Sequence, residues 1–293
     1  RPPQEVEKEN PPRKKKKYVK YSPLMLILLS VCAFVFSFSV FGFFEQSMLD
    51  LAGGAEIKTM FANVFGPVDW DGGISPDGTE ISPSSSSRGN WQSISPESID
   101  TGKLPFLQSL SFDGLKAQNP DTVAWMYWPT TVDVKGLPFN LPVVQSGDND
   151  YYLERSFDRS YSLNGWIYAD FRCDMSDLLS SRNTILYGHA RSNLIFGGLR
   201  YLNTKTKWQQ DAYNHFIYIN TPEERTVWQV FAWYETTVHF NYIDTTFNSD
   251  GEYVQFLNSL QSNNTVSAFE KFNFTADDRI LTLSTCKGTN SDV

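Results

Sequence analysis

Residues 279–286 read RILTLSTC, a short run of leucine and β-branched residues that ends in a cysteine. This composition is typical of a β-strand. Side chains alternate along a strand, so Thr282, Ser284 and Cys286 share one face while the leucines take the other. The pattern predicts a strand whose polar face carries the Cys286 thiol at its exit. That position suits a nucleophile and a core cysteine equally well.

Further short β-like runs precede this one, and turn residues separate them. They cover residues 125–127, 141–145, 166–169, 183–187, 215–220 and 226–234. Helical periodicity is clear at 249–264, where apolar residues recur at i, i+3, i+4 and i+7 as Tyr253, Phe256, Leu257 and Leu260. The predicted class is mainly β, a barrel or sandwich with helices inserted at its edges.

His189 is the histidine best placed for chemistry. In NTILYGHARS at 183–192 it follows an apolar strand and a glycine, where the strand gives way to a loop. His215 opens a predicted strand and His239 follows one, so both are predicted to be surface residues at strand ends.

The cysteines are too few for a disulfide scaffold. Cys32 lies in an apolar run, so at most one bridge is possible, between Cys173 and Cys286. Cys173 lies among carboxylates in DFRCDMSD, and negative neighbours raise a thiol pKa. Cys173 is therefore the poorer candidate nucleophile.

Three stretches together resemble class B sortases, the cysteine transpeptidases of Gram-positive cell surfaces: TLSTC at 282–286, YGHA at 187–190 and LPVVQSGDNDYYLERSF at 141–157. The resemblance extends from about Asn119 to the last residue. It implies a sortase β-barrel of about eight strands. It also places the helix at 249–264 in the long loop between the sixth and seventh strands.

The resemblance implies acyl transfer, with Cys286 and His189 as catalytic residues. The Cys286 thiolate would attack the carbonyl after the threonine of a sorting signal near the C-terminus of a surface protein. His189 would protonate the leaving amine, then activate the amine of a peptidoglycan precursor or of a pilin lysine. Tyr187 and Ser284 are the candidates for lining the substrate groove, because each lies two residues before a catalytic residue.

The sequence departs from the family at its end. Sortases use an arginine eight to ten positions after the cysteine, which falls past Val293. Arg279 is predicted on the opposite strand face, whereas Arg191 and Arg200 are conceivable substitutes. We therefore expect the chain to be truncated before its last strand and to be inactive by itself.

An uncharged apolar run of 22 residues, at 23–44, is long enough to span a bilayer as a helix. Basic residues precede it, which predicts a cytoplasmic tail at 1–22, a single-pass anchor in the cell membrane and an extracellular remainder. A cleaved signal peptide is the competing interpretation, but its apolar region is usually shorter. Residues 45–103 are predicted to be a juxtamembrane segment and a Ser/Gly/Pro-rich spacer, and 104–293 the catalytic domain.

Charge argues against a nucleic-acid partner. The chain has a net charge of −8, and because residues 1–22 carry +5, the other 271 residues carry −13. No metal or cofactor is predicted, since Asp148 and Asp150 lack the remaining spacing of a calcium loop and favour a turn. The alternative function is a membrane-anchored extracellular adhesion or binding domain without catalysis.

Overall fold

The computed structural model describes residues 112–128, 130, 134, 139–191, 195–237 and 239–285. The predicted tail, membrane anchor and spacer lie outside the described residues, and so does Cys286. None of the helices in the described ranges is both long enough and apolar enough to cross a membrane.

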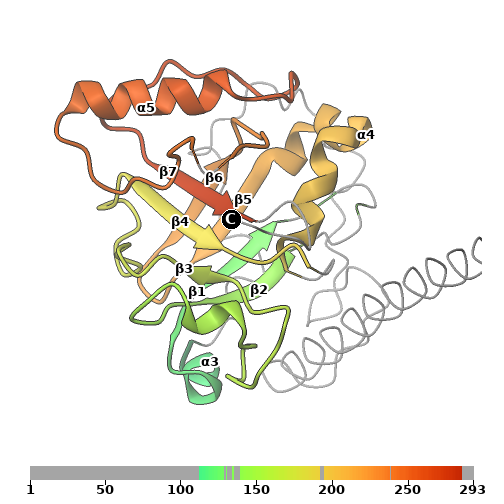
Figure 1. Ribbon diagram of the computed structural model, residues 1–293, viewed down its shortest axis with the longest axis vertical. Coiled ribbons are helices and arrows are strands. Elements are labelled where there is room, and N and C mark those ends of the chain that lie inside the picture. Colours follow the sequence, from blue (N-terminus) through green and yellow to red (C-terminus); the bar gives the residue numbers. More distant parts are fainter. Residues whose placement is uncertain are drawn as a thin grey trace, which may run out of the picture. The chain divides into compact units, whose positions relative to one another are not determined.

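Seven strands form one sheet in the order β6-β5-β1-β2-β3-β4-β7 (Figure 1). They are β1 Thr122–Trp128, β2 Phe139–Val144, β3 Tyr168–Ala169, β4 Asn183–Tyr187, β5 Phe216–Asn220, β6 Arg225–Gln229 and β7 Ile280–Ser284. Neighbours are antiparallel except for the β2–β3 and β4–β7 pairs, which are parallel. The two edge strands, β6 and β7, line the same pocket, so the sheet curls until its edges approach one another.

Helical segments occupy the connections between the strands. The α-helices are α3 Phe112–Gln118, α4 Thr206–Gln210 and α5 Asp250–Ser262, and the 3-10 segments are η5 Tyr151–Leu153, η6 Phe196–Thr204 and η7 Ala212–His215. Helix α5 lies in the connection between β6 and β7, as the sequence predicts (Figure 1). It begins after Ser249, whose side chain accepts a hydrogen bond from the Glu252 N–H and so caps the first turn.

Buried apolar side chains form two clusters. The larger one contains consecutive residues of β1 and β5, which point to opposite faces of the sheet, and Leu281 and Leu283 of β7 pack against it. The smaller one joins Tyr253, Leu257 and Leu260 of α5 to Ile280 of β7. Along β7 the two leucines thus pack against the main core, while Ile280 packs with α5.

Three sequence expectations need correction. The strand predicted at 226–234 ends at Gln229, as β6. The aromatic residues Phe231 and Tyr234 beyond it pack against the α5 cluster and are not part of the sheet. Of the strand predicted at 166–169, only the last two residues, Tyr168 and Ala169, form β3. His215 is buried and not at the surface, since its ring packs edge-on against Phe269 with centroids 4.8 Å apart. His239 is exposed, as predicted.

Candidate functional site

The parallel pairing of β4 with β7 brings two predicted site residues together. Tyr187 and Ser284 are register partners, and the Gly188 N–H extends the pairing by donating to the Ser284 carbonyl over 3.2 Å. Parallel strands end at the same edge of a sheet, so the chain leaves β4 toward His189 where β7 ends. Cys286 is the second residue after Ser284 in sequence.

Gly188 allows the turn before His189 to pack closely. A Cβ at this position would lie 2.8 Å from Ile195 Cγ2 and 2.9 Å from Phe196 ring atoms. Any side chain would therefore displace the segment that carries His189.

The His189 imidazole is half-buried and is held by one hydrogen bond from its ring. Its Nε2 lies 2.9 Å from the Leu153 carbonyl oxygen. A carbonyl only accepts hydrogen bonds, so Nε2 carries the proton and Nδ1 is the nitrogen that exchanges one. Burial and the charge of Arg191 lower the His189 pKa, and the Leu153 carbonyl and Glu154 partly offset this.

The face of β7 that leads to Cys286 is polar and attached to the segment after β6. Ser284 Oγ lies 2.8 Å from the Tyr242 hydroxyl, and Thr282 Oγ1 donates to Asn183 Oδ1 over 2.7 Å. The Asn183 amide in turn donates to the carbonyls of Tyr242 and Asp244. Thr282 and Ser284 therefore share one face, as the alternation predicts.

Asp170 is a buried carboxylate directly beside this face. It accepts two side-chain bonds from Arg172, of 2.9 and 2.7 Å, and one of 2.9 Å from the Tyr187 hydroxyl. Burial opposes its ionisation, but the hydrogen bonds from Arg172 and Tyr187 and the Arg172 charge together outweigh burial and lower the Asp170 pKa to about 2. Burial and Asp170 raise the Tyr187 pKa, so that phenol stays protonated.

The other candidate residues have structural partners. The Cys173 thiol is free and buried, and burial, more than the neighbouring Asp170, raises its pKa. This confirms the predicted direction, although the main cause is burial. The Asp148 carboxylate accepts from the N–H groups of Asp150 and Tyr151, which is the predicted turn, and no cluster suited to a metal occurs among the described residues.

The arginines that were considered as oxyanion partners are bonded to backbone carbonyls. Arg191 donates to the Leu163 carbonyl, and Arg200 to that of Gly197. Arg279 donates to the Leu179 carbonyl and precedes the first residue of β7, so it lies at the opposite end of this strand from Ser284. Each of these three guanidinium groups therefore binds a backbone carbonyl and stabilises the local fold.

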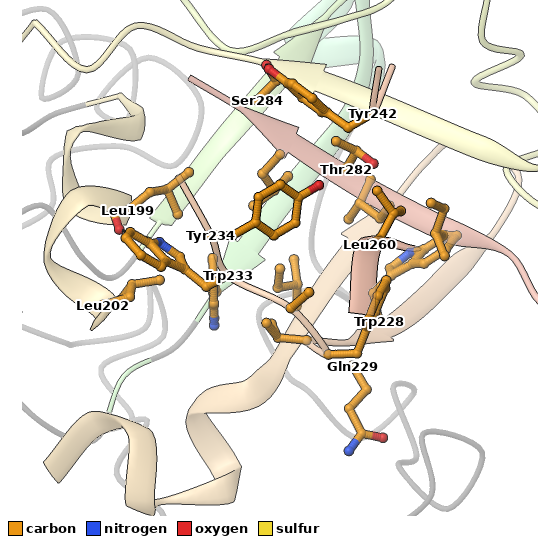
Figure 2. A pocket seen from close by; sticks show the side chains of 18 of the residues that line it. Leu199, Leu202, Trp228, Gln229, Trp233, Tyr234, Tyr242, Leu260, Thr282 and Ser284 are labelled. Atoms are coloured by element: carbon orange, nitrogen blue, oxygen red, sulfur yellow. Dashed lines mark hydrogen bonds between the residues drawn. The ribbon is translucent and has the colours of Figure 1, made fainter. Parts of the chain in front are cut away.

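A pocket of about 410 Å³ lies between β6 and β7. Figure 2 shows the Tyr234 ring within it, with Trp228 and Leu260 on one side and Tyr242 and Ser284 near its upper rim. The outer edges of β6 and β7 have no partner among the described strands. The pocket therefore borders the strand end from which the TLSTC sequence continues to Cys286.

Sequence reasoning missed three features of the site. The Leu153 carbonyl is a backbone group, so no side-chain pattern marks it. Asp170 and Arg172 are two residues apart in DFR, a spacing that signals nothing without the fold. Tyr242 reaches Ser284 across 42 sequence positions, and only the tertiary structure shows this contact.

Comparison with known proteins gives consistent relatives, although no protein-family model matches the chain. Sortase B of Staphylococcus aureus is 33% identical over 182 residues, which span 62% of this chain and 69% of the relative. Sortase B of Listeria monocytogenes is 31% identical over 174 residues, which span 59% of this chain and 65% of the relative. The solved S. aureus sortase B–substrate complex superimposes with a TM-score of 0.53 over 62% of this chain and 79% of that one, at 33% identity. These similarities confirm the expected barrel class.

Proposed function

The chain belongs to the class B sortase family, and on that premise we propose that it cleaves a C-terminal sorting signal of surface proteins and transfers the acyl group to an amine. The observation that carries this proposal is the parallel β4–β7 register. It places the segment with His189 beside the strand end that continues to Cys286.

In this mechanism the Cys286 thiolate attacks the carbonyl carbon of the scissile peptide bond. The electron pair of the carbonyl moves to oxygen, and its return expels the amine while a thioester remains on Cys286. The leaving amine takes its proton from Nδ1–H of the His189 imidazolium. Nε2 keeps its proton and its bond to Leu153 throughout.

The second half of the reaction reverses these roles. The nitrogen of the incoming amine attacks the thioester carbon, and the neutral Nδ1 of His189 takes a proton from that amine. The Cys286 thiolate then leaves. The candidate acceptors are the amine of a peptidoglycan precursor and the lysine of a pilin. We propose that Tyr187 and Ser284 line the groove for the sorting signal, because they are register partners and each lies two residues before a catalytic residue.

The proposed location follows from the sequence. The anchor at 23–44 would hold the enzyme in the cell membrane of a Gram-positive organism with its N-terminus inside, and the spacer would hold the catalytic domain away from the membrane surface.

The test is cleavage of a panel of quenched fluorescent sorting peptides, with Cys286→Ala and His189→Ala beside the parent. We expect one peptide to be turned over by the parent and by neither variant. The 293-residue chain and a longer form that continues past Val293 are assayed in parallel, because the expected arginine falls past that position. A folded protein that cleaves no peptide in either form and gives no thioacyl adduct would instead support the adhesion function.

A further inference from the structure

The segment that supplies the Leu153 carbonyl is tied to the rest of the domain by a buried polar cluster. We call Asn119, Asp121, Tyr152 and Arg159 the Tyr152 cluster. The Tyr152 hydroxyl donates to Asp121 Oδ2 over 2.7 Å and accepts from the Asn119 amide over 2.8 Å. Both Asn119 and Tyr152 are fully buried.

Arg159 closes this cluster from the far end of the same loop. Its guanidinium lies 2.7 Å from Asp121 Oδ2, and its Nε donates to Asn119 Oδ1 over 3.1 Å. Arg159 also adopts a positive φ of 67°, which is unfavourable for a residue with a side chain. Such a conformation persists where neighbours impose it, and Arg159 lies in the turn closed by the Arg155–Tyr161 bridge, where its N–H donates to the Ser156 carbonyl over 3.0 Å.

Leu153 follows Tyr152 directly, so the position of its carbonyl depends on where the cluster holds Tyr152. Behind it, Gly165 lies so close that an added Cβ would come within 2.6 Å of the Tyr152 and Leu153 carbonyl oxygens. The Trp166 N–H also donates to the Tyr152 carbonyl over 3.1 Å. The η5 turn is thus fixed on its side-chain side by the cluster and on its backbone side by Gly165 and Trp166.

We propose that the Tyr152 cluster positions His189 for proton transfer, acting through the Leu153 carbonyl. Its members are positioning residues, because the imidazole bonds to the Leu153 carbonyl and to no member of the cluster. The inference rests on the proposed function in so far as His189 is the acid and base of that reaction. It adds that the tautomer and orientation of His189 are set by residues in a different part of the sequence, which begins 70 positions earlier at Asn119.

The cluster acts on His189 alongside two charged neighbours. Arg191 disfavours the imidazolium and Glu154 favours it, and neither belongs to the Tyr152 cluster. Loosening the Leu153 bond would remove a contact that favours the charged ring. The His189 pKa would then fall further while the Arg191 and Glu154 charges stay in place.

The decisive variant is Tyr152→Phe, which removes one hydroxyl and keeps the buried ring. Asp121→Asn is the second variant, because it keeps the shape and weakens the bond to Arg159. Tyr161→Phe is the matched control, since Tyr161 is 67% exposed. Histidine-labelled NMR of the 293-residue chain reports the pKa and tautomer of His189. Peptide cleavage, measured with whichever of the two assayed forms turns over a sorting peptide, reports kcat and KM.

We expect both cluster variants to lower kcat by about 10- to 100-fold with KM nearly unchanged, since small misplacements of a catalytic group cost that much. The His189 pKa should fall and the Nε2–H tautomer should lose population, while Tyr161→Phe changes neither. Folded variants that retain the parent His189 titration and kcat would overturn the inference. If the parent cleaves no peptide, the proposed function fails, whereas the NMR titration still tests the positioning.

Discussion

At the scale of single residues, the environment of His189 sets the acid limit of the proposed reaction. Burial and Arg191 lower its pKa below the ordinary 6.5. The reactive pair is thiolate plus imidazolium, which holds the same number of protons as thiol plus neutral imidazole. Below the lower of the two pKa values the pair gains a further proton and the thiolate is lost, so activity should fall in acid, and we assign this acid limb to His189.

Arg191→Gln tests this assignment. Removing the positive charge should raise the His189 pKa toward 6.5, so the acid limb of kcat/KM should move to higher pH. The measurement is a pH profile of peptide cleavage. Arg225→Gln, an exposed position on β6, is the control and should leave the limb in place. A limb that does not move in Arg191→Gln would assign it to a group other than His189.

The cysteines differ in predicted reactivity. Burial raises the pKa of Cys173 and also blocks its thiol from solvent, whereas Cys286 is the proposed nucleophile. At pH 7 we expect Cys286 to be alkylated at least about tenfold faster than Cys173, because burial lowers both the thiolate fraction of Cys173 and its access to the reagent. Peptide mapping by mass spectrometry after timed iodoacetamide treatment measures both rates. Equal alkylation rates would contradict the assignment of Cys286 as the reactive thiol.

At the scale of elements, Asp170 fastens three segments together. It binds Arg172 in its own turn and Tyr187 on β4, and Arg172 Nη2 also donates to the Ile243 carbonyl over 3.1 Å. Ile243 belongs to the connection between β6 and α5. One buried carboxylate thus links β4, the turn after β3 and the segment that covers Ser284.

This carboxylate predicts a specific loss of stability in acid. Its folded pKa of about 2 lies below the unfolded value, so its contribution is full above pH ~4 and disappears as the pH falls toward 2. Asp170→Asn should cost about 1–3 kcal/mol at pH 7, since it leaves Arg172 without its buried partner. The deficit should shrink in urea unfolding at pH 3. Asp277→Asn, on the exposed surface, is the control, and a deficit independent of pH would contradict the assignment.

Sequence patterns located the elements well where apolar periodicity and strand pairing agree. The run 183–187 is β4 residue for residue, and the stripe on 249–264 is the buried face of α5. The pattern failed at 226–234. The aromatic residues beyond Gln229 resemble a strand in composition, but they pack against α5 and line the pocket. The 3-10 segment at 196–204 was missed as well, since its glycine pair and short turns give no helical period.

At the scale of the whole molecule, the family resemblance supplied what local patterns do not contain. Alternation placed Thr282 and Ser284 on one face of β7, and that placement is confirmed by their polar contacts. The partner strand, the parallel register and the proximity of His189 to the end of β7 come from contacts between positions about 100 residues apart. Composition and periodicity carry no information about such pairings.

The two apolar clusters predict that stability is uneven across the domain. Helix α5 joins the fold mainly through Tyr253, Leu257 and Leu260, which pack with Ile280 of β7, while the larger cluster holds the central strands β1 and β5. Local opening of α5 should therefore require less free energy than opening of the sheet.

Leu257→Ala tests this division. The side chain is fully buried in the smaller cluster, so its truncation should cost about 2–4 kcal/mol. Hydrogen exchange should show faster exchange across α5 and near-parental protection in β1 and β5. Gln255→Ala, on the exposed face of the same helix, should leave both unchanged. Equal loss of protection in α5 and in the central strands would mean that the two clusters unfold as one unit.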